Sequence, residues 1–417
     1  MPPQMTRQSE VAAIADGVFR PGARPAPTIA IAFFGHDSDE STVIKRARAF
    51  QGEGARVVGF MFRRVRNQRD GSTEWQNIPF GTTVERNYLL RIPKLLLAIL
   101  KTYRQRDVLK QCDVIYARNL DMLLIAVTAK RLSGATAPVV YEVLDIQRVF
   151  LGKGFAGKLF RWAERRLLGA TSLLVVSAPD FVSQYFQPAY GFTGRWFLLE
   201  NKLPDKAIGP NVLARREMLP PGPPWVIGMF GVLRCMRSLD ILTHVAEQLG
   251  DQVRIYLRGI VSEPDIPAEH LAAICARLPN VIFDGAYRNP QDLPEIYGKI
   301  HLIWAADFLD PGGNSKWLLT NRIYEGGVMG AVLLAARGNA TGRMVEREGL
   351  GFTLDEPLKD SIVAFIKNLD SNTFLAVRER VRGADRSIFV DETDTKQLIR
   401  QFGDLAAGTS ATRKGLV

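Results

Sequence analysis

Short apolar runs alternate with longer amphipathic segments along most of the chain. A first series of runs, rich in Val, Ile, Leu and Phe, falls at residues 28–34, 55–62, 112–117, 137–144 and 171–178. A run of this length that is apolar on both faces is typical of a strand buried inside a parallel sheet. The segments between the runs have helical length and spacing, so the pattern predicts an α/β sheet with helices on both faces.

A second series of the same kind falls at residues 224–231, 253–259, 280–285, 300–306 and 331–336. Residues 198–224, which are rich in Pro, Gly and charge, separate the two series and are typical of an interdomain linker. We therefore expect two doubly wound domains facing a central cleft. The predicted parts are a Pro-rich flexible tail at 1–27, an N-terminal domain at 28–205, a C-terminal domain at 206–385, and a helix with a frayed tail at 386–417 that can pack back on the first domain.

The formal net charge of +11 over 417 residues favours an anionic partner, which can be a nucleic acid, a membrane surface or a phosphorylated ligand. The three cysteines lie far apart in apolar surroundings, so they predict neither a metal site nor a disulfide framework. No apolar run approaches the roughly 20 residues of a membrane-spanning helix. We expect a cytoplasmic protein that is soluble or peripherally attached to a membrane.

Polar residues follow nearly every predicted strand, where ligands bind in sheets of this kind. In the second half these residues include Arg234, Arg237 and Arg322. Guanidinium groups with glycine loops and helix N-termini favour a diphosphate site. The sequence contains no Walker lysine motif, and no Gly-x-Gly-x-x-Gly follows a strand, which disfavours ATP hydrolysis and dinucleotide binding. A nucleotide-sugar remains, because its diphosphate leaving group needs preformed cations.

Glu325 lies one helical turn beyond Arg322 in an otherwise apolar stretch. Its carboxylate can accept hydrogen bonds from a ribose diol. The alternative is an intrahelical ion pair with Arg322, worth a few tenths of a kcal/mol, about 0.2–0.5. The glycines of "EGGVMG" favour the ligand, since they thin the helix where a molecule must approach closely.

The segments "TNRIYEGGVMGAVLLA" and "FGVLRCMRSLDIL" resemble the donor-site motifs of GT-B glycosyltransferases of family 4. The resemblance implies two Rossmann-like domains and no metal or other cofactor, with the nucleotide-sugar as co-substrate. It places Arg322 and Arg237 on lysines that contact the donor diphosphate, with Arg234 as an additional cation, and Glu325 on the ribose-binding glutamate. The remaining donor positions are Gly231 and the loop backbone near Tyr287 and Arg288, which meets the base.

The chain departs from the family pattern at Trp317, where many retaining members have a second glutamate. The loop formed by Gly312, Gly313, Asn314, Ser315 and Lys316 would then hold the donor sugar. An inverting reaction needs a general base on the acceptor side. Our candidate is Asp145, whose alternative role is a helix N-cap. Glu142 is the second candidate, with a buried ion pair as its alternative.

Four residues at strand ends of the first domain are candidate acceptor ligands. Arg118 and Asn119 can grip an acceptor or a phosphate, and a surface ion pair is the alternative for them. His36 and Asp37 can contact the acceptor, and the alternative is a solvated loop. The other histidines are scattered without ligand spacing, so no metal site is predicted.

The stretches "DVIYARNLDMLLIA" and "YEVLDIQR" are most similar to bacterial exopolysaccharide enzymes of the succinoglycan type. This narrower resemblance implies a hexosyl- or uronosyltransferase that moves a sugar, with UDP-hexose as the expected donor, to a polyprenyl-diphosphate-linked oligosaccharide at the inner membrane face. Residues 89–110 and 151–169 interleave Leu, Phe and Trp with Lys and Arg, as do helices that bind anionic bilayers. Ordinary sheet-packing helices with a charged outer face are the alternative.

Two other functional classes remain. A non-catalytic GT-B scaffold in a polysaccharide assembly is suggested by the missing second glutamate. A nucleic-acid-binding protein is suggested only by the net charge, and the sequence contains no recognised nucleic-acid module. We therefore expect no nucleic-acid partner.

Overall fold

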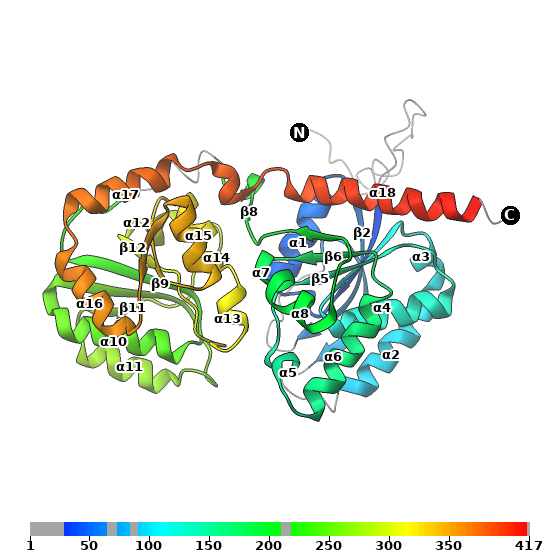
Figure 1. The fold of residues 1–417 in the computed structure, drawn as a ribbon, viewed down its shortest axis with the longest axis horizontal. Coiled ribbons are helices and arrows are strands. Elements are labelled where there is room, and N and C mark those ends of the chain that lie inside the picture. The colour runs from blue at the N-terminus through cyan, green and yellow to red at the C-terminus, as the bar shows by residue number, and fades with distance from the viewer. Residues whose placement is uncertain (1–28, 65–72, 84–90, 210–217, 415–417) are drawn as a thin grey trace, which may run out of the picture.

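The computed structural model describes residues 29–64, 73–83, 91–209 and 218–414. The predicted tail at 1–27 lies outside the described residues. The described chain forms two α/β halves that lie side by side, with the final helices running along one edge of both (Figure 1).

The first half contains a seven-stranded sheet with the order β3-β2-β1-β4-β5-β6-β7, in which every pair of neighbours is parallel. Its strands are β1 (Ala30–Gly35), β2 (Arg56–Arg64), β3 (Gln76–Thr83), β4 (Val114–Arg118), β5 (Val139–Val143), β6 (Leu173–Val176) and β7 (Trp196–Leu198). Its helices are α1 (Ser41–Gly52), α2 (Arg91–Arg104), α3 (Arg106–Lys110), α4 (Leu120–Ser133), α5 (Arg148–Leu151), α6 (Phe155–Leu168), α7 (Pro179–Phe181) and α8 (Gln187–Tyr190), with a π-helical turn at Val182–Phe186.

The second half contains a six-stranded parallel sheet with the order β11-β10-β9-β12-β13-β14. Its strands are β9 (Trp225–Leu233), β10 (Val253–Val261), β11 (Val281–Phe283), β12 (Leu302–Trp304), β13 (Val332–Ala336) and β14 (Gly351–Leu354). Its helices are α10 (Met236–Leu249), α11 (Ala268–Arg277), α12 (Leu293–Gly298), α13 (Asn314–Trp317), α14 (Asn321–Val328), α15 (Ala340–Glu348), α16 (Leu358–Asn368) and α17 (Ser371–Gly383).

The chain crosses between the halves twice, and the two crossings are paired. Strand β8 (Leu203–Pro204) in the first crossing lies parallel to β15 (Val390–Asp391) in the second. The chain then forms α18 (Asp394–Lys414), whose Leu398 and Phe402 are fully buried against the first sheet. The final helix therefore packs on the half of the molecule where the chain begins.

The strands of the first sheet carry apolar residues at both odd and even positions, which point to opposite faces, so both faces of the sheet are covered. In β1, Ala32 and Phe34 belong to one buried cluster, whereas Ile31 and Phe33 belong to the cluster on the opposite face. The prediction of two doubly wound parallel sheets is therefore confirmed. The exact domain limits stay a prediction.

The sequence pattern missed two strands of the first sheet. Strand β3 is an edge strand that contains Pro79 and Gly81 and exposes much of its length, so it has no apolar run. Strand β7 has only three residues and is also at an edge. Within the described residues, no helix combines the length and apolar character needed to cross a bilayer.

Candidate functional site

Glu325 on α14 is buried, with 8% of its surface exposed. Its Oε1 accepts a hydrogen bond from Asn289 Nδ2 at 2.6 Å, and its Oε2 accepts one from the Tyr297 hydroxyl at 3.4 Å. Burial raises the pKa of Glu325, against the opposing effect of these donors and of nearby cations. Among the described residues no ion pair joins Glu325 to Arg322, so the intrahelical pair is not what holds this carboxylate.

Arg322 and Arg237 approach the same segment, which follows strand β12. The Arg322 guanidinium donates to the Ala306 carbonyl at 2.9 Å. The Arg237 guanidinium, in the first turn of α10, lies 4.5 Å from the centre of the Phe308 ring and forms an ion pair with Glu356. The two predicted diphosphate ligands thus contact one loop at positions two residues apart, Ala306 and Phe308.

The loop from Asp307 to Lys316 is held in shape by its own side chains. The Ser315 hydroxyl donates to Asp307 and accepts from the Asp310 amide, so it is engaged inside the loop. Gly312 and Lys316 are exposed. A Cβ on Gly313 would come within 2.0 Å of the Leu151 side chain, which belongs to the other half. The loop therefore needs glycine at this position because the two halves meet there.

Asn314 joins this loop to the first half of the molecule. Its Nδ2 donates to Asp145 Oδ1 at 2.9 Å, and its Oδ1 accepts from the Ile146 amide at 2.9 Å. Helix α5 has Gln147 at its N-cap, so Asp145 is not a helix cap. The Asp145 side chain keeps contact with solvent, but the surrounding protein removes enough water to raise its pKa, an effect that Asn314 and the Arg234 charge oppose.

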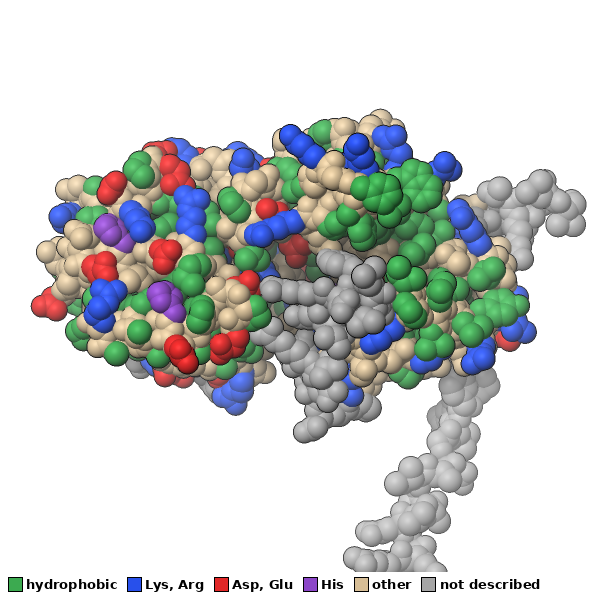
Figure 2. Space-filling model, turned by 90° about the horizontal axis from the view of Figure 1, so that it is seen from below, with side chains coloured by type: hydrophobic (Ala, Val, Ile, Leu, Met, Phe, Trp, Pro, Cys, Tyr) green, Lys and Arg blue, Asp and Glu red, His purple; other side chains and the backbone are tan. Residues whose placement is uncertain are grey.

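Arg234 is exposed, and its charge acts on Asp145 across the boundary between the halves. Within the part of the chain that the structure describes, no hydrogen bond or ion pair occupies its guanidinium. Figure 2 shows a recess between the two halves, with acidic side chains visible inside it. The predicted base and one of the predicted diphosphate ligands therefore act on each other from opposite halves.

The four predicted acceptor ligands divide into two groups. His36 lies at the end of β1, where its Nδ1 is 3.2 Å from Asn119 Nδ2 and its Nε2 is paired with Glu40. Asn119 has a positive φ of 72°, which is uncommon for a residue other than glycine and is found at functional sites. These two side chains remain compatible with contact to an acceptor.

Asp37 and Arg118 do not fit direct contact with an acceptor, because both are fully buried. Asp37 Oδ1 accepts from the backbone amides of Asp39 and Arg64, each at 3.1 Å, and so shapes the loop after β1. Arg118 is 1% exposed, so the alternative of a surface ion pair is also wrong for it.

Arg46, Arg118 and Glu142 form a buried ion-pair triad in the first half of the molecule. Arg118 Nε is 2.5 Å from Glu142 Oε2, and Arg46 Nε is 3.1 Å from Glu142 Oε1. The two guanidinium groups lower the pKa of Glu142, although burial alone would raise it. Glu142 therefore forms a buried ion pair, which was the alternative to its role as general base. Its lowered pKa makes it a poor proton acceptor.

Two charged residues near this site, Glu40 and Lys45, were not predicted from the sequence. Glu40 pairs with His36, and although burial raises its pKa, the contacts with His36 and the charge of Arg118 lower it to about 2. Lys45 on α1 donates from Nζ to the Asn201 carbonyl at 2.9 Å. Burial lowers the pKa of Lys45 to about 7, and the charge of Glu325 from the other half opposes this shift. Neither residue belongs to a motif, and only the packing of α1 against the linker brings Lys45 here.

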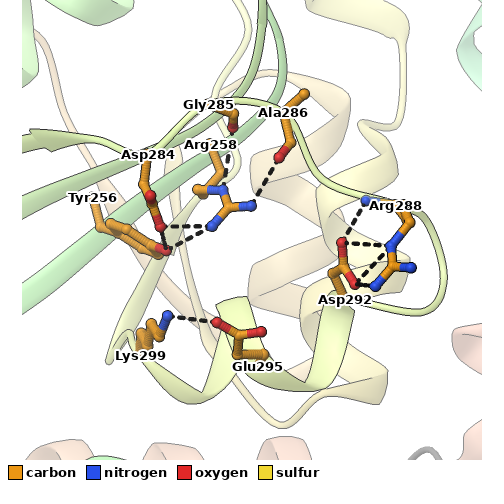
Figure 3. A network of polar contacts seen from close by, with 9 residues as sticks. All are labelled: Tyr256, Arg258, Asp284, Gly285, Ala286, Arg288, Asp292, Glu295 and Lys299. Atoms are coloured by element: carbon orange, nitrogen blue, oxygen red, sulfur yellow. Dashed lines mark hydrogen bonds and ion pairs between the residues drawn. The ribbon is translucent and has the colours of Figure 1, made fainter.

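The loop at residues 284–292, which includes the predicted base-binding positions, is drawn in Figure 3. Tyr287 is half-buried beside Phe230, with ring centres 6.5 Å apart. The Arg288 side chain is turned to solvent and paired with Asp292. Gly231, at the end of β9, has a φ of 112° that favours glycine. In the described chain, no group of His, Cys, Asp and Glu has the arrangement of a metal site.

Comparisons with known proteins identify the family and the fold of the chain. No protein-family model matches the sequence. The succinoglycan biosynthesis protein ExoL of Rhizobium meliloti (strain 1021) is 36% identical over 378 residues, which cover 90% of this chain and 93% of ExoL.

Similar solved structures share the fold at low sequence identity. Anabaena Alr3699/HepE in complex with UDP has a TM-score of 0.63 and 17% identity over 90% of this chain and 100% of that protein. Sucrose-phosphate synthase from Thermosynechococcus elongatus has a TM-score of 0.65 and 15% identity over 91% of this chain and 100% of that protein. The chain therefore belongs to the family of the succinoglycan biosynthesis protein ExoL and has the GT-B fold.

Proposed function

We propose that this protein is a glycosyltransferase that moves a hexose from a UDP-sugar to a polyprenyl-diphosphate-linked oligosaccharide in exopolysaccharide synthesis. The observation that carries the proposal is the buried carboxylate of Glu325. It is held by Asn289 and Tyr297, no ion pair neutralises it among the described residues, and its burial costs stability. A carboxylate kept in this state is explained by a ligand that donates hydrogen bonds to it, such as a ribose diol.

The donor diphosphate fits the cations around the loop that follows β12. Arg322 and Arg237 border the loop, and the charge of Arg234 acts on Asp145. When the sugar leaves, negative charge develops on the diphosphate, and cations that are already in place stabilise it without rearrangement. The ExoL protein and the UDP complex of Alr3699/HepE support this choice of pathway and nucleotide.

Asp145 is the proposed general base for an inverting transfer. Its raised pKa makes it a better proton acceptor than an ordinary aspartate near neutral pH. The hydrogen bond from Asn314 places the carboxylate next to the proposed donor-sugar loop. The proton of the acceptor hydroxyl would pass to Asp145 as the hydroxyl oxygen bonds to the anomeric carbon and the nucleoside diphosphate departs.

A lipid-linked acceptor fits the surface formed by α2 and α6. Large apolar side chains are exposed there, among them Leu96 at 63%, Phe155 at 81% and Trp162 at 58%. Figure 2 shows hydrophobic side chains gathered on this half, with Lys and Arg around them. Helix α2 contains no acidic residue, and Glu164, which is the acidic residue of α6, is buried beneath three tyrosine hydroxyls.

This surface is the basis for a proposed peripheral location on the inner face of the cell membrane. Attraction of a basic surface to anionic lipid contributes about 1 kcal/mol for each Lys or Arg near the bilayer. The part of the predicted amphipathic segment at residues 89–90 lies outside the described residues.

The test has two stages. Thermal stabilisation by UDP, GDP and dTDP at equal concentrations should be largest for UDP, and labelled sugar from UDP-glucose should pass to a polyprenyl-diphosphate-linked oligosaccharide. Nucleotide binding without transfer or donor hydrolysis would favour the non-catalytic scaffold instead.

Membrane attachment is tested separately by flotation. Vesicles containing phosphatidylglycerol should retain the protein in a salt-sensitive manner, whereas pure phosphatidylcholine vesicles should not. A variant with Phe155→Asp and Trp162→Asp should lose retention, and Trp196→Asp, which changes an exposed tryptophan of β7, is the matched control. Retention that is equal for both vesicle types would contradict the proposal, as would tight binding to DNA or RNA.

A further inference from the structure

Arg258 lies near the end of β10 and uses all three guanidinium nitrogens in hydrogen bonds (Figure 3). Only 11% of its side chain is exposed. Nε donates to the Gly285 carbonyl at 3.2 Å, and Nη2 donates to the Ala286 carbonyl at 2.8 Å. Nη1 donates to Asp284 Oδ2 at 2.7 Å and to the Tyr256 hydroxyl at 3.2 Å. One side chain thus holds three consecutive residues of the loop after β11.

The contact with two neighbouring carbonyls restricts the loop more than a simple ion pair does. The guanidinium is a planar fork, so it fixes the direction of both carbonyls, whereas an exposed ion pair with Asp284 alone would contribute little. Gly285 has a positive φ of 65°, which lets the chain turn at this point. The Gly259 amide donates to the Gly285 carbonyl at 2.8 Å and adds a second tie to β10.

The restrained loop leads directly to the proposed donor site. Tyr287 follows Ala286, and the charges of Glu325 and Arg322 act on its hydroxyl. Two residues later, Asn289 donates to Glu325, the proposed ribose ligand. The residues that Arg258 holds and the residue that donates to Glu325 therefore belong to one short stretch of backbone, residues 284–289.

Three backbone groups in this stretch remain available to a ligand. In the portion of the chain described, no hydrogen bond engages the amides of Ala286 and Tyr287 or the carbonyl of Tyr287, whereas Arg258 occupies the carbonyl of Ala286. A pyrimidine base presents both donors and acceptors on one edge, and backbone amides and carbonyls can match them if their directions are fixed.

We propose that Arg258 is a positioning residue that sets the geometry of the 284–288 loop for recognition of the donor base. The inference rests on the proposed UDP-sugar function. Arg258 does not touch the base. It turns the carbonyls of Gly285 and Ala286 toward itself, and the amides of Ala286 and Tyr287 and the Tyr287 carbonyl are left to bind the nucleotide.

The test compares two ligands that share the phosphates and differ in the base. Calorimetry measures the Kd of UDP and of inorganic pyrophosphate for the wild type, Arg258→Met, Arg258→Lys and Arg254→Met. Arg254 lies on the same strand and is exposed, and its side chain forms no hydrogen bond among the described residues, so it is the matched control. Arg258→Met keeps the side-chain length and removes every donor.

We expect Arg258→Met to weaken UDP on the order of tenfold, with pyrophosphate unchanged, because the loop and not the phosphate site is disturbed. Arg258→Lys should recover part of the loss, and Arg254→Met should match the wild type. Hydrogen exchange should rise at residues 284–292 in Arg258→Met while the exchange of strands β9 and β13 stays the same, which also shows that the variant is folded.

Two results for the Arg258→Met variant would overturn the inference. UDP binding that is unaffected in Arg258→Met would show that the loop does not need this residue, and an equal loss for UDP and pyrophosphate would show a general defect. A wild-type protein that binds pyrophosphate but not UDP would instead refute the proposed donor, and the inference with it.

Discussion

Replacing Arg322 with alanine separates a catalytic role from a structural one. In the structure the guanidinium makes one hydrogen bond, to the Ala306 carbonyl at 2.9 Å, and no ion pair within the described residues. The net contribution of one such hydrogen bond is about 1 kcal/mol. Arg322→Ala should therefore lower the free energy of unfolding by about 1 kcal/mol, measured by denaturant titration.

The expected loss of activity is much larger. If Arg322 stabilises the charge that develops on the departing diphosphate, its removal should reduce kcat by about 10²–10³-fold, or roughly 3–4 kcal/mol in the activation free energy. The assay is transfer or hydrolysis of UDP-glucose under saturating donor. Arg322→Lys, which keeps a cation and has the residue of the resembling family at this position, should recover a large part of the rate. Losses of activity and of unfolding free energy that are equal in kcal/mol would refute the reasoning.

Three further predictions concern the buried charges and the tight glycine contact. Glu325→Gln should stabilise the fold by roughly 1 kcal/mol at pH 7 and weaken UDP binding at least tenfold. Because burial raises the pKa of Glu325 in the folded state, the folded protein holds this proton more tightly than the unfolded chain does. The stability advantage of Gln over Glu, measured by denaturation at a series of pH values, should therefore shrink as pH falls through that pKa and grow as pH rises. Glu142→Gln should destabilise the protein by about 3–5 kcal/mol in denaturant titrations, because it leaves Arg46 and Arg118 buried without their counter-ion, and a change below about 1 kcal/mol would contradict the buried triad. Gly259→Ala should lower the unfolding free energy by about 3 kcal/mol or more, because its φ is 137° and the new Cβ would lie 1.7 Å from the Gly231 carbonyl oxygen. Gly383→Ala is the control: the position has open space around it, and the variant should remain near wild type in stability.

The sequence alone was sufficient to predict the two parallel sheets and the positions of most of their strands. A fully buried strand must be apolar on both faces, so β1, β4 and β13 appear in the sequence as continuous apolar runs. Strand β3 could not be found in this way, because an edge strand exposes part of its length and tolerates Pro79 and Gly81. The residues at strand ends were also identifiable, since parallel strands bring their loops to one edge.

Only the tertiary structure decided what each of those polar residues does. Arg118 and Asn119 are neighbours in sequence, yet the first is enclosed in an ion pair with Glu142 and the second is half-buried beside His36. The link between Asp145 and Asn314 and the approach of Lys45 to Glu325 join residues from different halves of the chain. Hydrophobic periodicity reports which face of an element is buried. The partner of a charged group depends on how the two sheets pack together, and no local stretch of sequence contains that information.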